Sequence, residues 1–113
     1  MKIIKDHLTL DELKEMAAHG FGNMVKAVVD VDRGFLAVDA ELHSDLEALL
    51  LKEGSQQKSL WGINLYPEMI GNDFVEFDSM INLRPSQGNR SRSVENETMR
   101  ATIFALVQKR AVR

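Results

Sequence analysis

The sequence has no cysteine and few prolines and glycines. Without cysteine, the chain has no disulfide scaffold, no thiol nucleophile and no thiolate zinc site, which fits a reducing cytoplasm. Two prolines and seven glycines among 113 residues, with 44% apolar residues, exclude a disordered or low-complexity chain. A chain of this length buries about two-thirds of the surface that it exposes when unfolded. We therefore expect one domain over residues 1–113.

Long apolar runs and an excess of positive charge are also missing. No apolar run approaches the roughly 20 residues of a membrane-spanning helix, and Asp6 and His7 interrupt the N-terminal apolar segment before it resembles a signal peptide. The net charge of −3 argues against nucleic-acid binding by bulk electrostatics, and aromatic residues for base stacking are few. We predict a cytoplasmic protein with no membrane partner and no specific nucleic-acid partner.

Three helices are predicted from capping signals and apolar spacing. Thr9–Glu12 matches a capping box, in which a hydroxyl and a carboxylate satisfy the first amides, and the helix that follows ends at Gly20. Ser44–Glu47 matches a second capping box and opens a helix that ends at Gly54. A third helix is predicted from about Val94 to about Arg110, since its apolar residues recur at helical spacing.

Four strands are predicted from alternating apolar residues and from β-branched content. The first two are joined by a short turn at Gly34, which indicates an antiparallel hairpin. In the fourth, the residues expected to face inward are Val75, Phe77, Ile81 and Leu83. The four predicted strands are Met24–Val31, Phe35–Ala40, Ser59–Tyr66 and Phe74–Leu83.

The order of these elements, α-β-β-α-β-β-α, predicts the fold class. Two ββα units after a leading helix are typical of an α+β two-layer sandwich with a four-stranded, largely antiparallel sheet and helices packed on one face. The second face would then be uncovered by helices, although it carries apolar side chains. This predicts a homo-oligomer, in its simplest form a homodimer, that buries Val28, Leu36, Val38, Phe74 and Met80.

A loop rich in arginine and serine follows the fourth predicted strand. Between Asp78 and Glu95 the chain has three positive charges and no negative one, and it leads from a strand into the start of a helix. Such a junction presents free amides and a partial positive charge, where arginines bind phosphate or carboxylate well. The predicted anion site comprises Arg84, Gln87, Gly88, Asn89, Arg90, Ser91, Arg92 and Ser93.

The alternative is that this loop is solvated and purely structural. It contains neither the phosphate-binding GxxxxGK[ST] motif nor the dinucleotide-binding GxGxxG motif. Its arginines could instead pair with nearby acidic residues, and serine and asparagine are common in turns and helix caps. Those acidic residues are Glu76, Asp78, Glu95 and Glu97.

A second candidate site follows the second predicted strand. In extended chain, the alternating residues Glu41, His43 and Asp45 would project to one side. Carboxylates with an imidazole suit a divalent metal, so a metal-assisted hydrolase is an alternative function. The opposing interpretation is that Ser44 caps the helix and Asp45 complements its dipole.

Four segments resemble a family of short, uncharacterised prokaryotic proteins known only as a domain of unknown function. They are MVKAVVDVDRG, ELHSDLEALLLKEGS, LWGINLYPE and FDSMINLRPSQGNRSR, of which INLRPSQGNRSR is the most distinctive. The resemblance spans nearly the whole chain and implies a cytoplasmic, stand-alone prokaryotic protein. It brings no activity and no cofactor with it.

The prediction that follows is a small binding module rather than an enzyme. Its partner would be a phosphate-bearing small molecule, such as a nucleotide, bound at the arginine-rich loop, and no cofactor is predicted. The homo-oligomer and the metal-assisted hydrolase remain the two alternatives.

Overall fold

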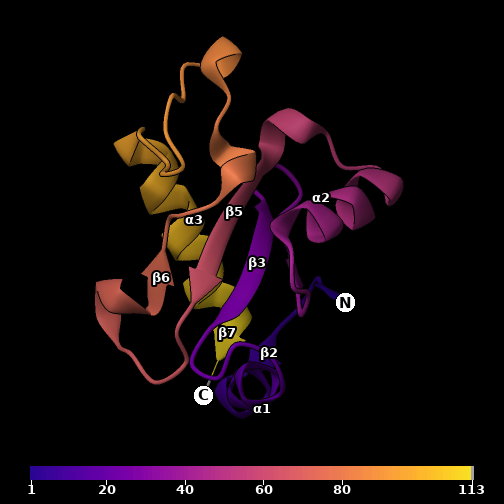
Figure 1. The fold of residues 1–113 in the computed structure, drawn as a ribbon, viewed down its shortest axis with the longest axis vertical. Coiled ribbons are helices and arrows are strands. Elements are labelled where there is room, and N and C mark those ends of the chain that lie inside the picture. The colour runs from indigo at the N-terminus through magenta and orange to yellow at the C-terminus, as the bar shows by residue number, and fades with distance from the viewer. Residues whose placement is uncertain (113) are drawn as a thin grey trace.

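A five-stranded antiparallel sheet forms the centre of the computed structural model, which describes residues 1–112 (Figure 1). The strands lie in the order β1-β4-β3-β5-β6, and a separate pair of short parallel strands joins β2 to β7. The strand bounds are β1 Lys2–Ile4, β2 Leu8–Thr9, β3 Val25–Asp30, β4 Phe35–Val38, β5 Leu60–Leu65, β6 Val75–Glu76 and β7 Ala111–Val112.

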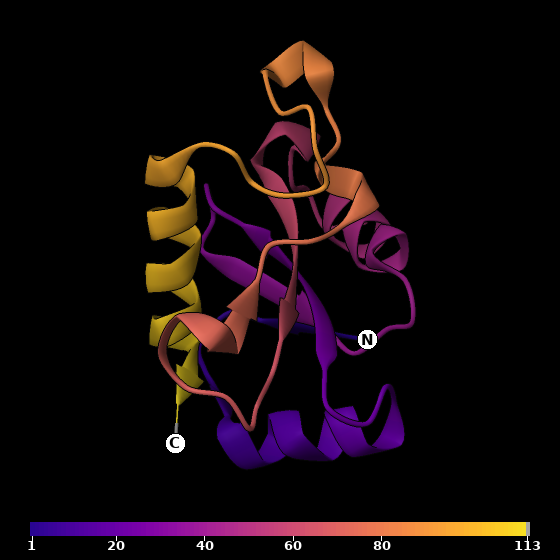
Figure 2. The same cartoon turned by 60° about the vertical axis from the view of Figure 1, so that its left-hand side comes forward.

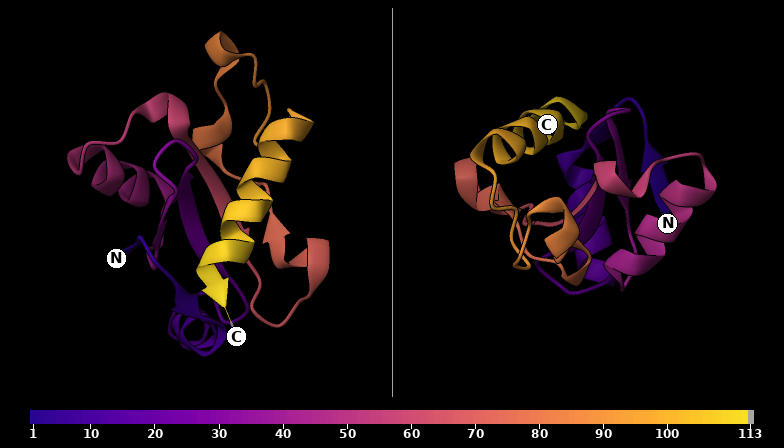
Figure 3. Two further views of the ribbon diagram at one scale, coloured as in Figure 1. Left: turned by 180° about the vertical axis from the view of Figure 1, so that it is seen from behind. Right: turned by 90° about the horizontal axis from the view of Figure 1, so that it is seen from above.

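Three α-helices cover both faces of this sheet. They are α1 Leu10–His19, α2 His43–Lys52 and α3 Glu97–Arg110. Figures 2 and 3 show α3 along one face, α2 on the opposite face and α1 across one end. The chain is therefore a mixed α+β fold with the expected antiparallel sheet, but the prediction that the helices pack on one face is wrong. The four-strand count is also wrong, because β1 adds a fifth strand beside β4.

The larger core lies between the sheet and the helices α1 and α3. Strand alternation directs Val25, Ala27 and Val29 of β3 to this side, opposite Trp61, Ile63 and Leu65 of β5. Leu13 and Ala17 of α1 and Ile103 and Val107 of α3 close it, and all are buried. The predicted alternation of β3 and β5 is thus confirmed.

The smaller core lies between the sheet and α2. Here Val28 and Leu60 of the sheet contact Leu46 and Leu50 of α2, and all four are fully buried. The chain's own helix therefore covers these apolar side chains of the second face.

The register of the hairpin corrects the residues assigned to that second face. Leu36 pairs with Val29 and Val38 pairs with Ala27, so both belong to the larger core. Phe74 is likewise buried in the larger core, and of the five residues expected at an oligomer interface only Met80 is exposed.

The helix starts follow the predictions in part. Thr9 caps α1, and both hydrogen bonds of its capping box with Glu12 are present. The second box is absent, because α2 begins at His43 and has no side-chain cap. Helix α3 begins at Glu97, later than predicted, with Asn96 Oδ1 accepting from the Met99 amide at 2.8 Å.

The predicted long strand over residues 74–83 is wrong. Only Val75 and Glu76 pair with β5, after which the chain turns away and forms a short 3₁₀ helix, Met80–Asn82. The alternation in this segment arises because Ile81 packs against the smaller core, while Phe77 packs against the larger one. None of the helices within residues 1–112 is long and apolar enough to cross a membrane.

Replacing Leu50 with alanine should destabilise the fold by about 2–5 kcal/mol, since it leaves a cavity between α2 and the sheet. The neighbouring Leu51 is 40% exposed, so Leu51→Ala serves as a control and should cost less than about 1 kcal/mol. Urea unfolding followed by circular dichroism measures both. Equal losses would contradict the packing of α2 on the second face.

Candidate functional site

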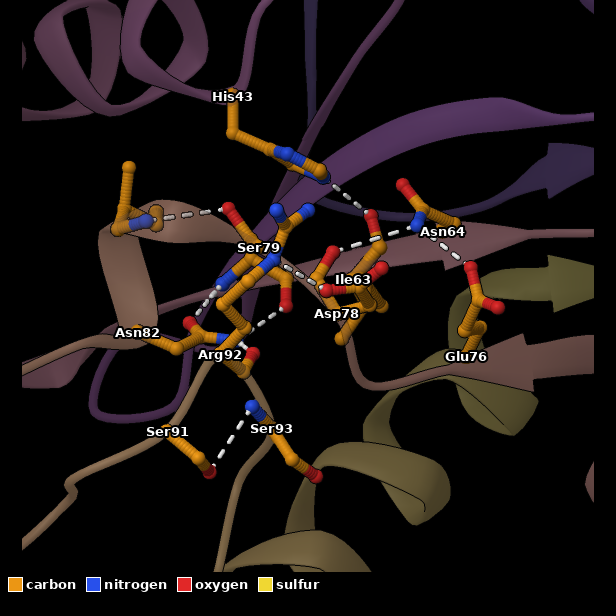
Figure 4. A network of polar contacts seen from close by, with 12 residues as sticks. His43, Ile63, Asn64, Glu76, Asp78, Ser79, Asn82, Ser91, Arg92 and Ser93 are labelled. Atoms are coloured by element: carbon orange, nitrogen blue, oxygen red, sulfur yellow. Dashed lines mark hydrogen bonds and ion pairs between the residues drawn. The ribbon is translucent and has the colours of Figure 1, made fainter.

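A cavity of about 180 Å³ opens at the N-terminal end of α2, on the face of the sheet that this helix covers. It lies where the start of α2 meets β3, β5 and the irregular segments that follow β6 (Figure 4). Most of its lining is polar or charged, unlike the core beside it. The lining residues are Lys26, His43, Ser44, Asn64, Asp78, Ser79, Met80, Ile81 and Arg92.

The sheet supplies a row of polar side chains to this region. Lys26 of β3 pairs with Asn64 of β5, and Asn64 in turn pairs with Glu76 of β6. Directly opposite residues on neighbouring strands project from the same face, so the three side chains lie in line. This row therefore places polar groups, which can bind a ligand, on a sheet face that is apolar at Val28 and Leu60.

The orientation of the Asn64 amide is fixed by its neighbours. Its Nδ2 donates to Glu76 Oε1 at 2.8 Å and to the Asp78 carbonyl at 3.3 Å. Both partners are acceptors, so only the nitrogen can face them. The oxygen Oδ1 therefore points the other way, toward His43 in Figure 4, and it is buried.

His43 is the first residue of α2 and is buried. Its Nε2 lies 2.8 Å from the carbonyl oxygen of Ile63, an acceptor, so this nitrogen carries the proton. Burial lowers the pKa of His43, and Lys26 acts in the same direction. The Ile63 carbonyl, the Asn64 side chain and Asp78 oppose this shift without reversing it. The imidazole is therefore neutral at pH 7.

Arg92 and Asp78 form an ion pair at the mouth of the cavity. Arg92 Nε donates to Asp78 Oδ1 at 2.7 Å, and the two side chains are 56% and 44% exposed. The terminal nitrogens of Arg92 have no protein partner within residues 1–112 and point away from Asp78 in Figure 4. They are free to donate to a bound group.

Asn82 holds the segments that carry Asp78 and Arg92 against the sheet. Its Oδ1 accepts from the Gly62 amide at 2.8 Å, and its Nδ2 donates to the Gly62 carbonyl at 2.9 Å and to the Arg92 carbonyl at 3.0 Å. The Ser79 amide also donates to the Arg92 carbonyl, at 3.0 Å. The Ser79 side chain lies so close to Gly62 that a Cβ added to this glycine would be 2.5 Å from it.

The predicted anion loop does not form a single cluster. Arg84 stacks on the ring of Trp61 at 4.1 Å and donates to the carbonyls of Gln57 and Leu60. Its guanidinium group therefore makes internal contacts that stabilise the fold. Asn89 is buried and bonds the backbone of four loop residues.

The rest of that loop separates into two parts. Gln87 and Gly88 lie at the exposed tip, which projects from the top of the molecule in Figure 1. Ser91 Oγ accepts from the Ser93 amide, and Ser93 Oγ accepts from Arg100, so both serines make internal contacts. Arg90 is exposed, and among the residues of the predicted anion site Arg92 alone lines the cavity.

The predicted metal cluster is not assembled. Extended chain ends at Leu42, so His43 and Asp45 lie in the first turn of α2 rather than in line with Glu41. Glu41 and Asp45 are exposed, and only His43 lines the cavity. Within residues 1–112, no three histidine or carboxylate side chains are placed to hold a metal ion.

The sequence analysis did not select Lys26, Asn64 or Ser79 as site residues. A signal existed for the first two, because Asn64 is a polar residue in an otherwise apolar β5, and Lys26 is a charged residue in a β3 that is apolar apart from Lys26 and Asp30. Their pairing across β3 and β5 required the register of the sheet.

The comparisons with known proteins describe the family but no activity. Residues 2–110 match the family model DUF5674, described as a protein of unknown function. No curated protein and no solved structure matches the chain.

The depressed pKa of His43 predicts a pH-dependent stability. The unfolded chain binds a proton at its ordinary pKa of about 6.5, whereas the folded chain binds it only at lower pH. The contribution of His43 to the free energy of unfolding is therefore fully present above about pH 6.5, and it is lost as the pH drops below that value. His43→Gln should flatten this part of the profile, measured by urea unfolding between pH 7.5 and 5, and an unchanged slope would contradict the assignment.

Asn82→Ala should destabilise the protein by at least about 2 kcal/mol, because it leaves the buried Gly62 amide and carbonyl without partners. Asn72 is exposed, so Asn72→Ala is the matched control and should change stability by less than about 0.5 kcal/mol. Urea unfolding of the two variants decides whether Asn82 anchors this segment.

Proposed function

The chain belongs to the DUF5674 family of proteins of unknown function, and we propose that it is a binding module whose cavity beside α2 holds a small anion. This proposal keeps the anion of the sequence prediction but moves the site from the whole arginine-rich loop to the cavity that Arg92 lines. The ligand class is a phosphate or another small oxyanion.

The observation that carries the proposal is the set of free donors around one small cavity. Arg92 offers its terminal nitrogens, and Lys26 lines the cavity while its ammonium group lies 5.1 Å from the centre of the Phe21 ring. Ser44 adds a hydroxyl, and Ser79 Oγ accepts from the Ile81 amide, which leaves the hydroxyl hydrogen of Ser79 to donate elsewhere. Charge-assisted hydrogen bonds of this kind are the strong ones in proteins.

The start of α2 adds to the attraction. His43 and Ser44 line the cavity, and no side chain caps the amides of this ten-residue helix. The N-terminal amides of a helix carry a partial positive charge and bind anions. Two cationic side chains and this helix end face one carboxylate, Asp78, because His43 is neutral at pH 7.

The same charges disfavour the hydrolase alternative. A divalent cation in this cavity would face Lys26 and Arg92, and it would have one carboxylate and one imidazole for ligands. The site therefore suits a negative ligand better than a metal ion.

Titration of the ¹⁵N-labelled protein with inorganic phosphate at low salt tests the proposal. We expect shifts at the amides of His43, Ser44, Ser79 and Arg92 that weaken as salt screens the charges. Arg92→Gln should lower the affinity at least about tenfold, because it removes charge-assisted hydrogen bonds.

Arg90→Gln is the matched control, since Arg90 is exposed, lies two residues away and does not line the cavity. It changes the net charge equally and should alter the affinity less than about threefold. Equal losses in the two variants, or no shifts at all, would overturn the proposed site.

A further inference from the structure

A cavity of about 490 Å³ lies between α3 and β6, the outermost strand of the sheet (Figure 1). Three consecutive residues of the chain, Val75, Glu76 and Phe77, line it. Side chains alternate between the two faces of a strand, so Glu76 projects away from the face of its two neighbours. The cavity therefore extends along the edge of β6 as well as over the face toward α3.

The backbone of β6 presents unpaired groups on this edge. The Tyr66 amide donates to the Phe74 carbonyl at 2.9 Å, so the backbone of Phe74 is directed at β5. In an antiparallel pair this direction alternates along the strand. Glu76 therefore also directs its backbone at β5, whereas Val75 directs its amide and carbonyl outward.

Phe77 continues this alternation. The side chain of Asn64 in β5 donates to the Asp78 carbonyl at 3.3 Å, so Asp78 is directed at β5 and Phe77 outward. Within residues 1–112 no strand pairs with the outer edge of β6, and neither Val75 nor Phe77 has a backbone hydrogen bond in a turn or loop. Two amides and two carbonyls are thus available on this edge.

Helix α3 provides the second wall of the cavity. Its Ala101 is exposed, and its Phe104 is partly buried against the larger core. Alternate side chains of a strand added to β6 would project toward this wall. The edge therefore combines the main-chain groups and the apolar pocket that are used when an extended peptide adds a strand to a sheet.

Two charges distinguish the faces of such an added strand. Arg100 lies on the α3 side, where its guanidinium is 4.7 Å from the centre of the Phe77 ring. Glu76 projects from the other face, and its Oε1 accepts from Asn64 and Tyr66, while Oε2 has no hydrogen bond within residues 1–112. A residue opposite Glu76 is therefore favoured by positive charge, and its neighbours toward α3 are favoured by apolar side chains.

The same glutamate disfavours a second copy of this chain as the added strand. Pairing about a two-fold axis at Glu76 would bond Val75 of one copy to Phe77 of the other. It would also set the two Glu76 side chains directly opposite each other, where like charges are destabilising. The edge therefore suits a different strand.

We propose that β6 and α3 bind an extended peptide segment of a partner protein as an antiparallel sixth strand, with a lysine or arginine between two apolar residues. The apolar residues enter the cavity beside Val75 and Phe77, and the basic residue pairs with Glu76. This cavity shares no lining residue with the cavity beside α2, so the inference stands apart from the proposed anion site.

Fluorescence anisotropy of the full chain with a labelled heptapeptide, Thr-Thr-Val-Lys-Val-Thr-Thr, tests the charge preference. We expect it to bind at least about threefold more tightly than the same peptide with a central glutamate. Glu76→Gln should remove this preference. Glu97→Gln changes the net charge equally at an exposed residue outside the cavity and should keep it. Loss of the preference in both variants would overturn the pairing with Glu76.

Methylation of peptide nitrogens tests the strand pairing itself. The amides of the two valines would point to β6, whereas the lysine amide would point away. N-methylation of either valine should weaken binding at least about tenfold, because it removes a hydrogen bond, and N-methylation of the lysine should weaken it less than about threefold. Equal effects would overturn the strand addition.

Ala101→Leu fills the cavity from α3 and should weaken peptide binding at least about fivefold. Thr102→Leu adds the same side chain at an exposed position of α3 outside the cavity and should leave binding unchanged. Circular dichroism checks that both variants fold. Failure of either peptide to bind the parent chain, or equal losses in the two leucine variants, would overturn the proposal. A dimer that Ala101→Leu dissociates in sedimentation would assign the edge to a second copy instead.

Discussion

The pairing of the Asn82 side chain with Gly62 is the interaction on which the candidate site depends. An amide side chain has an NH₂ group that donates and an oxygen that accepts, and Asn82 uses both on the Gly62 backbone, as a residue of a neighbouring strand would. Strand β6 pairs with β5 only at Asn64 and Leu65. Beyond that point Asn82 takes the place of a strand, and the chain is free to fold back toward α2.

This substitution has a spatial consequence for the loop that follows. Asn82 also bonds the Arg92 carbonyl, while Asn89 bonds the carbonyls of Asn82 and Ser93. Two asparagines therefore tie the entry and exit of the loop together and position Arg92 at the cavity. Arg84 has a different role, because burial lowers its pKa and its guanidinium stacks on Trp61. Arginines that look equivalent in the sequence thus differ in what surrounds them.

The sequence predicted those features that depend on local interactions. The Thr9 capping box, the alternation of β3 and β5 and the turn at Gly34, which has a φ of +73°, are each set within a few residues. The register of β4 against β3 depends on the geometry of the turn that joins them, and an error of one residue in this register assigned Leu36 and Val38 to the wrong face.

The site was predictable only in fragments, because it depends on contacts between residues that are distant in the sequence. His43 and Arg92 were both predicted as site residues, but in two separate candidate sites, the metal cluster and the anion loop. The cavity that joins them requires Lys26 opposite Asn64 across two strands and Asn82 on Gly62, and neither pairing has a signature in nearby residues. The alternation of apolar residues also cannot reveal that the Asn82 side chain pairs with β5 in place of a strand. Residues 74–83 were therefore predicted as one continuous strand.

The parallel pair of β2 and β7 has a consequence for how the chain reaches this fold. Leu8 pairs with Ala111, and Arg110 donates to the Asp6 carbonyl at 2.9 Å across 104 positions of sequence. Contacts this distant along the chain require the closure of the largest loop available, whose entropy opposes them until other contacts have formed. Docking of the end of α3 is therefore expected late in folding, after the hairpin of β3 and β4, which closes a loop of only a few residues.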